Sequence, residues 1–296
     1  MKKIIEYVKH PSYILLGLDR MKLIKLNDAF YLKIIYYQTF NKKLDLSNPK
    51  TFNEKLQWLK LYDRNPEYTK MVDKYEVKKY VAEKIGEEYI IPTIGIYDSF
   101  EEINFKELPD QFVIKCTHDS GGIVICKDKS NFNIEETRKK INKCMKNNYY
   151  RNWREWPYKN VKPRIIIEKY MEDKNKELND YKFFCFDGVA DNVMVCLDRK
   201  LGKPKFYFFD KDWRLLRINK RGVSAPQNFT ISRPDNLDKM FQIANQLSKN
   251  IPFSRIDLYN IDGKIYFGEI TFYPQSGFDN NLLEKTDIEF GKKIKL

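Results

Sequence analysis

The sequence predicts an α+β fold in which two mixed α/β lobes follow a helical N-terminal segment. Residues 1–65 are rich in Lys, Leu and Tyr and contain few strand-like runs, which indicates helices. From Ile90 onward the hydrophobic pattern changes to a period of two, which is typical of strands. The composition changes again near residue 160. We therefore expect a helical segment over residues 1–65, a first lobe over 66–160 and a second lobe over 161–296.

The composition suits a folded protein with an anionic partner. Hydrophobic residues make up 42% of the 296 residues and aromatic residues 15%, which is enough for a packed core. The 54 basic residues exceed the 41 acidic ones and give a net charge of +13. This excess predicts an anionic partner, but it does not separate a nucleotide from a nucleic acid, an acidic glycan or an anionic lipid.

Cysteine and histidine usage argues against several kinds of site. The five cysteines are odd in number and form no C-x-x-C pair, which disfavours a disulfide framework and a structural zinc site. His10 and His118 are the only histidines, so a histidine-based catalytic triad is not expected. No window approaches the roughly 18 apolar residues of a membrane span. We expect a cytoplasmic protein, with a peripheral contact at the inner face of the membrane left open.

Helix and strand signals follow one another along the chain. Thr51 and Glu54 resemble a capping box, and residues 73–85 have the spacing of a second helix. Asp187-Gly188 and Asp262-Gly263 are expected to form hairpin turns, because Gly tolerates positive φ. Further helices are expected at 134–147 and 236–250, and strands at 112–116, 123–126, 164–170, 181–186, 189–197, 205–209, 255–259 and 264–270.

A lysine at a strand end precedes a glycine-rich loop. Lys115 is followed, after a short gap, by Ser120, Gly121 and Gly122. Glycines let backbone N–H groups approach phosphate oxygens, and the lysine adds a positive charge. The loop leads into a strand rather than a helix, so it is not a P-loop. Taken alone, an ordinary glycine turn beside a surface lysine explains the same residues.

The segment around Glu168 has the character of a strand that ends in an acid. Where such a strand leaves the sheet, free backbone groups can pair with the edge of an adenine while the carboxylate faces the nucleotide. A buried strand with a capping charge is the simpler alternative for this segment alone.

A third motif is the hairpin formed by residues 255–269. Arg255 and Asp257 share one face of the first strand by alternation, and Glu269 on the return strand can lie close to Asp257. Two carboxylates that face one point, with an arginine beside them, suit a Mg²⁺ ion that bridges phosphates. A cross-strand charge cluster is the alternative.

Together, and in this order, these motifs resemble the ATP-grasp superfamily, which also has a lysine like that of Asp73-Lys74. The resemblance covers about residues 70–280. It extends to the TupA-like branch, named for teichuronopeptide synthesis and found in surface-polysaccharide gene clusters. The segments that resemble this branch are 50–57 (KTFNEKLQ), 180–188 (DYKFFCFDG) and 268–272 (GEITF). The resemblance implies an ATP-grasp fold, which holds ATP between the antiparallel sheets of the two lobes.

The resemblance also implies roles in nucleotide binding. Lys74 and Lys115 would hold the α- and β-phosphates, and the backbone of residues 120–122 would cover the phosphates as a flap. Asp180 would also belong to the nucleotide site. The adenine hinge would be formed by Glu168, Lys169 and Met171.

The same resemblance assigns the metal and the chemistry. Asp257 and Glu269 would bind Mg²⁺, Arg255 would steady the transferred phosphoryl group, and Lys182 would add a phosphate contact. Many ATP-grasp ligases have Asn where this chain has Thr271, so a single well-held Mg²⁺ is expected.

The implied activity is ATP-dependent ligation of a carboxylate to an amine through an acylphosphate. Positioning and charge neutralisation lower the barrier of such a reaction, which suits a chain with little histidine. By resemblance, the carboxylate belongs to a uronic acid of a capsular or cell-wall polysaccharide or its nucleotide- or lipid-linked precursor, and the amine to an amino acid. Arg199 is a candidate partner for the substrate carboxylate, with a surface arginine as the alternative.

Two other functions remain open at this stage. A glycosyltransferase would use an Asp-x-Asp metal site, and Asp210 and Asp212 have that spacing, although a hairpin turn explains them more simply. A non-catalytic basic binder of nucleic acid or membrane is disfavoured, because the basic residues are dispersed rather than gathered in one stripe. We expect no nucleic-acid partner.

Overall fold

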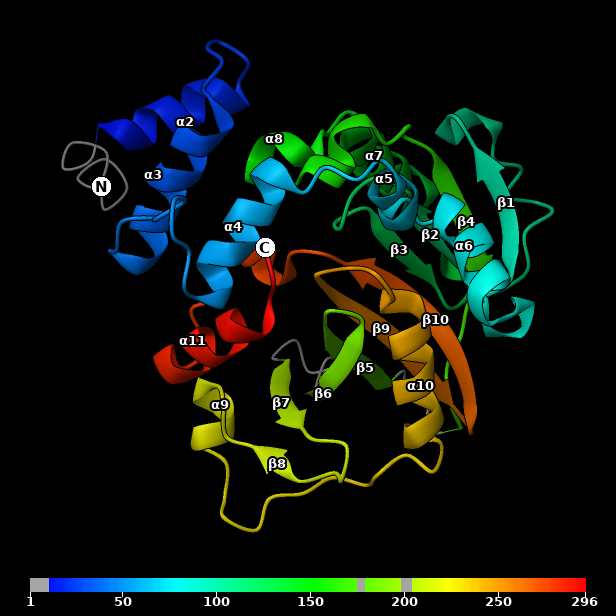
Figure 1. The fold of residues 1–296 in the computed structure, drawn as a ribbon. Helices are drawn as coiled ribbons and strands as arrows, with labels where there is room; N and C mark the ends of the chain where they lie inside the picture. The colour runs from blue at the N-terminus through cyan, green and yellow to red at the C-terminus, as the bar shows by residue number, and fades with distance from the viewer. Residues whose placement is uncertain (1–10, 175–178, 198–203) are drawn as a thin grey trace.

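The computed structural model describes residues 11–174, 179–197 and 204–296, which form helices and two antiparallel sheets (Figure 1). The first sheet has the strand order β1 (Thr93–Tyr97), β4 (Ile165–Lys169), β2 (Phe112–Cys116), β3 (Ile123–Cys126). The second has the order β10 (Lys264–Thr271), β9 (Phe253–Ile261), β5 (Asn179–Phe186), β6 (Val189–Leu197), β7 (Lys205–Phe209), β8 (Leu215–Leu216). The predicted α+β class is confirmed.

The N-terminal part is helical, as predicted, and packs against the C-terminal part of the chain. Its helices are α2 (Ser12–Arg20), α3 (Asp28–Phe40) and α4 (Phe52–Tyr62). The predicted capping box is present at α4, where Thr51 and Glu54 satisfy each other's backbone N–H groups. A separate hydrophobic cluster centred on Tyr31 and Leu32 includes Phe278. Helix α4 also packs on α11 (Glu284–Lys293), beside which it lies in Figure 1.

The first lobe builds its sheet around β2, which is central as predicted. Helix α7 (Ile134–Met145) covers one face, and its Ile141 shares a buried cluster with Phe112 and Ile114 of β2. Helices α5 (Glu67–Val72), α6 (Glu76–Ile85) and α8 (Tyr149–Trp153) complete this part of the chain. Strand β4 lies beyond the expected boundary at residue 160 but pairs with β1 and β2. The crossing to the second sheet therefore follows β4, and the division into three parts stays a prediction.

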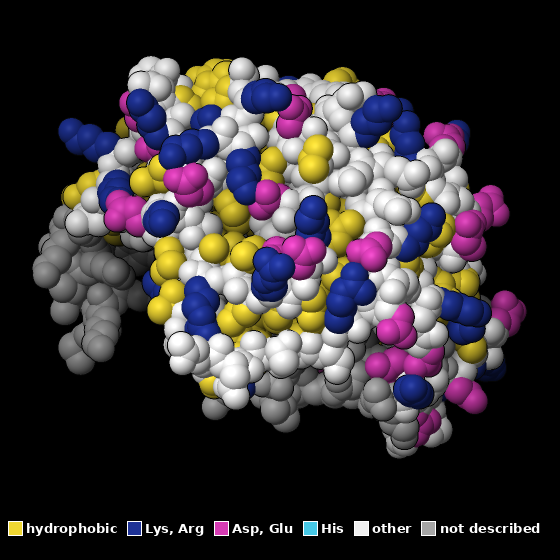
Figure 2. All heavy atoms as spheres, turned by 60° about the horizontal axis from the view of Figure 1, so that its bottom comes forward, with side chains coloured by type: hydrophobic (Ala, Val, Ile, Leu, Met, Phe, Trp, Pro, Cys, Tyr) yellow, Lys and Arg dark blue, Asp and Glu magenta, His cyan; other side chains and the backbone are white. Residues whose placement is uncertain are grey.

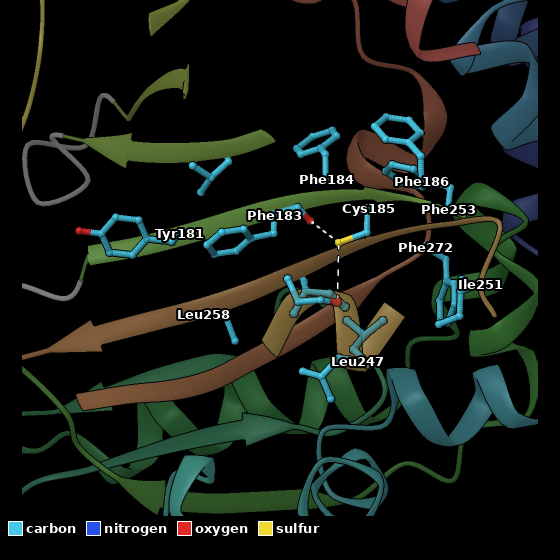
Figure 3. Packing of buried hydrophobic residues seen from close by; sticks show 14 of the residues in the cluster. Tyr181, Phe183, Phe184, Cys185, Phe186, Leu247, Ile251, Phe253, Leu258 and Phe272 are labelled. Atoms are coloured by element: carbon cyan, nitrogen blue, oxygen red, sulfur yellow. Dashed lines mark hydrogen bonds between the residues drawn. The ribbon is translucent and has the colours of Figure 1, made fainter. Parts of the chain in front are cut away.

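The second lobe buries both faces of its sheet. Helix α10 (Leu237–Ser248) covers one face, and the Cys185 thiol points toward it, within 3.9 Å of the Ala244 carbonyl oxygen (Figure 3). On the other face, Phe184 and Phe186 join a group of aromatic rings that includes Phe52 of α4. A short helix, α9 (Lys220–Val223), lies between β8 and α10 in the sequence.

Both predicted hairpin turns are confirmed by the backbone. Asp187 and Gly188 have φ angles of 51° and 78°, and Asp262 and Gly263 have 49° and 82°. Two successive positive φ angles match the right-handed twist of a two-residue hairpin. The second of these turns sets the pairing of β9 with β10, which carries the predicted metal ligands.

The helices of the described segments include none that combines the length and the apolar character needed to cross a bilayer.

Candidate active site

A cleft between the two sheets collects residues from both lobes. Lys115 and Glu269, which lie in different sheets, line this one cavity. The full lining consists of Lys74, Lys78, Ile90, Ile91, Lys115, Ile123, Glu168, Tyr259, Phe267, Gly268 and Glu269. The first lobe contributes three lysines and Glu168 to this lining, the second lobe contributes Glu269, and both lobes contribute apolar or aromatic residues. Such a cleft can accept an anion with an apolar ring system.

Glu168 fixes two lysines in the cleft. Its side chain is 7% exposed and forms ion pairs with Lys115, at 2.6 Å, and with Lys78. Burial alone would raise the pKa of Glu168, but the two lysines hold it below its ordinary value. The carboxylate therefore stays charged and orients both ammonium groups.

Lys78 was missed by sequence reasoning. It lies in the first turn of α6, four residues after Lys74, which precedes the helix, and burial lowers its pKa. Its Nζ also donates to the Ile91 carbonyl oxygen at 2.8 Å. The i, i+4 spacing from a lysine already assigned to the phosphates was the signal that could have found it.

The glycine loop is closed by its own aspartate. The Asp119 carboxylate accepts hydrogen bonds from the N–H groups of Gly121 at 2.9 Å and Gly122 at 2.8 Å. Lys74 Nζ donates to the Asp119 carbonyl oxygen, so the loop and this lysine are held together. A Cβ at position 122 would lie 2.7 Å from the Cys116 sulfur, which requires Gly there. Two of the three predicted flap amides, those of Gly121 and Gly122, thus bond to Asp119, and Ser120 is exposed.

The hinge residues point in different directions. The Glu168 side chain enters the cleft, whereas Lys169 is exposed and lines a shallow surface hollow with Pro92 and Tyr170. The Lys169 N–H donates to the Pro92 carbonyl oxygen at 3.0 Å. Met171 is half-buried, two residues after the end of β4. The roles predicted for Lys169 and Met171 stay predictions.

Asp257 and Glu269 face each other across the hairpin, as predicted. Arg255 donates from Nε to Asp257 Oδ1 at 2.6 Å and from Nη2 to Glu269 Oε1 at 3.0 Å. The same Nη2 lies 3.1 Å from the Thr271 hydroxyl, which in turn donates to Glu269. The arginine thus connects the two carboxylates predicted to hold the metal.

A β-bulge at Gly268 turns Glu269 toward the cleft. Before it, Ile265 and Phe267 point into the core, and strict alternation would place position 269 on the same face. The pairing shifts between Phe267 and Glu269, so Ile270 is buried instead. A Cβ at 268 would lie 3.0 Å from the Asp257 carbonyl oxygen, which favours Gly. Bulges often redirect a side chain beside an active site.

The charges near the hairpin are unequal. Burial disfavours the charged form of the Asp257 carboxylate and raises its pKa to about 6, although the positive charges of Arg255 and Lys182 act in the opposite direction. Burial would also raise the pKa of Glu269, but Arg255, Lys182 and Lys74 lower it to about 2. Lys182 pairs with Asp180 at 2.7 Å and with Asp257. Glu269 therefore has the lower pKa of the two carboxylates of the hairpin.

The donor set suits a magnesium ion that arrives with phosphate. Carboxylate oxygens are ligands that Mg²⁺ prefers, and Glu269 extends into the cleft with its side chain 44% exposed. Among the residues that the structure describes, no group of three or more His, Cys, Asp and Glu side chains could hold a metal. Two carboxylates leave most of the octahedral positions to phosphate oxygens and water.

A buried network supports one wall of the site and was also missed. Lys60 is 1% exposed, and its Nζ donates to the Trp153 carbonyl oxygen at 2.9 Å and to that of Ser276 at 2.6 Å. The Ser276 hydroxyl donates to Glu155 at 2.7 Å. Burial raises the pKa of Glu155 to about 7, while Lys60 and Arg255 lower it. The aromatic stretch after residue 149 thus contributes buried residues near Arg255.

The remaining predicted residues lie either outside the cleft or outside the residues that the structure describes. Arg199 lies outside the described residues. Asp210 shapes the turn between β7 and β8, because its carboxylate accepts from the Arg214 N–H at 2.8 Å. Asp212 is exposed, 3.7 Å from the Arg214 guanidinium. This geometry is that of a hairpin turn and gives no support to a nucleotide-sugar metal site.

The surface charges do not form a nucleic-acid footprint on the face that Figure 2 shows. Lys and Arg side chains there are interspersed with Asp and Glu and with apolar patches. A basic stripe would be the expected mark of a phosphate-backbone binder.

Comparison with known proteins gives a family. The family model described as TupA-like ATPgrasp matches residues 54–295. A search of curated proteins found no match. Among solved structures, the chain is similar to a D-alanine–D-alanine ligase from Bacillus anthracis (16% identity, TM-score 0.45, 82% of this chain and 67% of that chain). It is also similar to the enzyme of the same name from Helicobacter pylori (15%, 0.44, 84% and 70%) and to the D-cycloserine synthetase DcsG (14%, 0.40, 77% and 70%).

Proposed function

The chain belongs to the TupA-like ATP-grasp family, and from this premise we propose that it joins a uronic acid to an amine. As an ATP-grasp enzyme it is an ATP-dependent carboxylate–amine ligase that uses ATP and Mg²⁺. The proposed carboxylate is a uronic acid of a capsular or cell-wall polysaccharide, or of its precursor. The proposed amine is an amino acid or another primary amine.

One observation carries the proposal: three lysines and a charged glutamate line one cleft between the sheets. We assign Lys74 and Lys115 to the α- and β-phosphates, with Lys78 beside them. Glu168 holds Lys78 and Lys115 in place through ion pairs. The apolar side chains that line the cleft, Ile90 and Ile91 among them, suit the faces of an adenine ring.

Asp257 and Glu269 would hold Mg²⁺, which neutralises charge on the phosphates and fixes them in line with the acceptor. Arg255 bonds both carboxylates and has the reach to steady a transferred phosphoryl group. Thr271 supplies a hydroxyl beside Glu269 where an amide would be a stronger ligand. A single metal ion fits this set.

The reaction proceeds in two steps. A carboxylate oxygen of the substrate attacks the γ-phosphorus, the bond to the β-bridging oxygen breaks, and acylphosphate and ADP result. The amine then attacks the acyl carbon, loses a proton, and expels inorganic phosphate to leave an amide. The protein contributes positions and fixed positive charge rather than acid–base groups, which agrees with the residues around the cleft.

The net charge of +13 supports an acidic glycan or a phosphate-linked precursor as the acceptor. We place the reaction in the cytoplasm, with peripheral contact at the inner face of the membrane where such precursors are handled.

The test is ADP release from the purified protein, measured with several uronic acids crossed against amino acids. The reaction should require both substrates and Mg²⁺. Glu269→Gln should lower ADP release more than about 100-fold, because it removes a charged ligand of the metal. Glu289→Gln changes an exposed, ion-paired carboxylate on α11 in the same way and serves as the control. If none of the uronic acids in the panel supports ADP release, the proposed substrate class is excluded. Full activity of Glu269→Gln would exclude the proposed metal site.

A further inference from the structure

A second cavity, of about 250 Å³, adjoins the catalytic arginine. Arg255 lines it, and the same guanidinium bonds Glu269, which lines the nucleotide cleft. The ion pair between Arg255 and Glu269 therefore connects the two cavities. A substrate group in the second cavity can reach the place where the phosphoryl group is transferred.

One guanidinium nitrogen of Arg255, Nη1, is not used by the neighbouring carboxylates and hydroxyl. Its Nε and Nη2 serve Asp257, Glu269 and Thr271. Within the described part of the chain, no hydrogen bond is found for Nη1. A guanidinium presents its donors as a planar fork, so the two N–H groups of Nη1 are available to a carboxylate oxygen in the cavity.

The two sides of the cavity differ in chemistry. Phe184, Phe206 and Phe208, from strands β5 and β7, supply apolar surface. Gln275, Asp279 and Asn281, from the segment after β10, supply amide and carboxylate groups. A sugar ring has one apolar face and a rim of hydroxyl groups, so it matches an aromatic surface opposed by amides and an acid.

The polar side is held in a strained conformation. Gln275 and Ser276 have φ angles of 50° and 53°, and Gly277 follows with 67°. Left-handed backbone at a residue other than Gly costs about 1–2 kcal/mol and is found where surrounding bonds enforce it. Here Lys60 bonds the Ser276 carbonyl oxygen and Gln57 Nε2 donates to that of Gly277 at 2.6 Å. The turn thereby presents the exposed Gln275 side chain to the cavity.

Two further cations line the cavity, the half-buried Lys205 and the exposed Arg221. Arg221 lines the cavity and is exposed, unlike Arg255, which is 8% exposed. In the described parts of the chain Arg221 has no ion-pair partner. Asp279 is the acid of the cavity, and burial raises its pKa, so it opposes an anion less than an ordinary carboxylate would. The cavity can thus bind one anionic group at the buried Arg255 and another at the exposed Arg221.

We propose that this cavity binds a single sugar ring with two anionic groups, the reactive carboxylate at Arg255 and a phosphate ester at Arg221. This inference rests on the proposed ligase function and adds that the sugar acid is phosphate-linked rather than free. The volume lies below the roughly 300–1,000 Å³ of drug-sized ligand sites, so it admits one ring and not an oligosaccharide. A nucleotide or lipid carrier attached to the phosphate would extend into solvent.

The test is direct binding by titration calorimetry without amine, which does not depend on turnover. The probes are glucuronic acid, glucuronic acid 1-phosphate and UDP-glucuronic acid, each with the wild-type protein, Arg221→Gln and Arg214→Gln. Arg214 is an exposed arginine with a side chain 77% exposed, and its variant is the matched control. We expect the phosphate-bearing probes to bind more tightly than the free acid. Arg221→Gln should weaken only those two, by about 10- to 100-fold, as for loss of a charged hydrogen bond.

The two phosphate-bearing probes separate the sources of the phosphate. Equal affinity of both means that the sugar phosphate alone is recognised, whereas tighter UDP-sugar binding means that the carrier contributes; either supports the proposal. It is overturned if the free acid binds as well as the others, if Arg221→Gln equals Arg214→Gln, or if no probe binds. Probe binding that depends on Arg221 without any ADP release would keep this inference and exclude the ligase substrate. ADP release with a uronic acid that is unchanged in Arg221→Gln would support the proposed ligase function and exclude this inference.

Discussion

Replacement of the buried Lys60 by Met tests how the wall of the site is held. The side chain is 1% exposed, and its Nζ donates to Gln57 Oε1 at 2.9 Å and to the carbonyl oxygens of Trp153 and Ser276. Met fills a similar volume but donates nothing. Three acceptors then lose a partner, and Glu155 loses its nearest buried cation.

The cost follows from removal of a buried cation that interacts with the buried carboxylate of Glu155 and is connected to it through Ser276. Such a change destabilises a protein by about 3–5 kcal/mol, because the remaining charge is buried without compensation. Removal of the charge on Glu155 at the same time should return part of this loss. Lys60→Met with Glu155→Gln should therefore be less destabilised than the sum of the two single variants.

The effect should depend on pH. The folded-state pKa of Glu155 is raised to about 7, above its unfolded value, so its favourable contribution is complete below the unfolded pKa and is lost as pH rises toward 7. Burial lowers the pKa of Lys60 to about 7, so the wild type loses stability as pH falls through that value. In Lys60→Met the pKa of Glu155 is no longer lowered by Lys60, so the variant loses more stability than the wild type as pH rises. The variant also lacks the stability that neutral Lys60 contributes at high pH, so the substitution should cost more at pH 8 than at pH 5.5.

Urea unfolding at the two pH values, followed by circular dichroism, measures the free energy of unfolding. Lys70→Met removes an exposed, ion-paired lysine and is the control, with an expected change below about 1 kcal/mol. A Lys60→Met variant as stable as this control, or one that is less destabilised at pH 8 than at pH 5.5, would refute the reasoning.

Three further changes probe the cleft through ADP-release kinetics. Lys78→Met should raise the KM for ATP by about tenfold, because Glu168 then pairs with Lys115 alone; an unchanged KM would contradict its place at the phosphates. Gly268→Val should lower kcat by more than about 100-fold with the fold retained by circular dichroism, because the bulge that aims Glu269 is blocked; a kcat near that of the wild type would show that the bulge is not needed. Asp119→Ala should raise proteolysis at the glycine loop and change the KM for ATP several-fold, because two loop amides lose their acceptor; unchanged proteolysis and kinetics would show that the bonds do not restrain the loop.

The metal hairpin could be predicted because its signals are local. Alternation placed Arg255 and Asp257 on one face, and Asp262-Gly263 fixed the turn that brings the return strand back beside them. The bulge at Gly268 could not be predicted, because it depends on how the return strand pairs with β9. Alternation alone would have put Glu269 into the core.

The buried lysine network could not be predicted either. A lysine in a helix is normally exposed, and only contacts between distant segments reveal that Lys60 and Glu155 both bond to Ser276. The same holds for the second cavity, since Arg221 of helix α9 and Gln275 of the turn after β10 are far apart in the sequence.

Binding of a non-hydrolysable ATP analogue, measured by titration calorimetry with and without Mg²⁺, tests the shared cleft most directly. Lys115→Met should weaken binding under both conditions, whereas Glu269→Gln should remove the gain that Mg²⁺ gives and leave binding without metal intact. If Glu269→Gln kept the whole magnesium-dependent gain, or if Lys115→Met bound the analogue as tightly as the wild type, the two sheets would not hold one nucleotide between them.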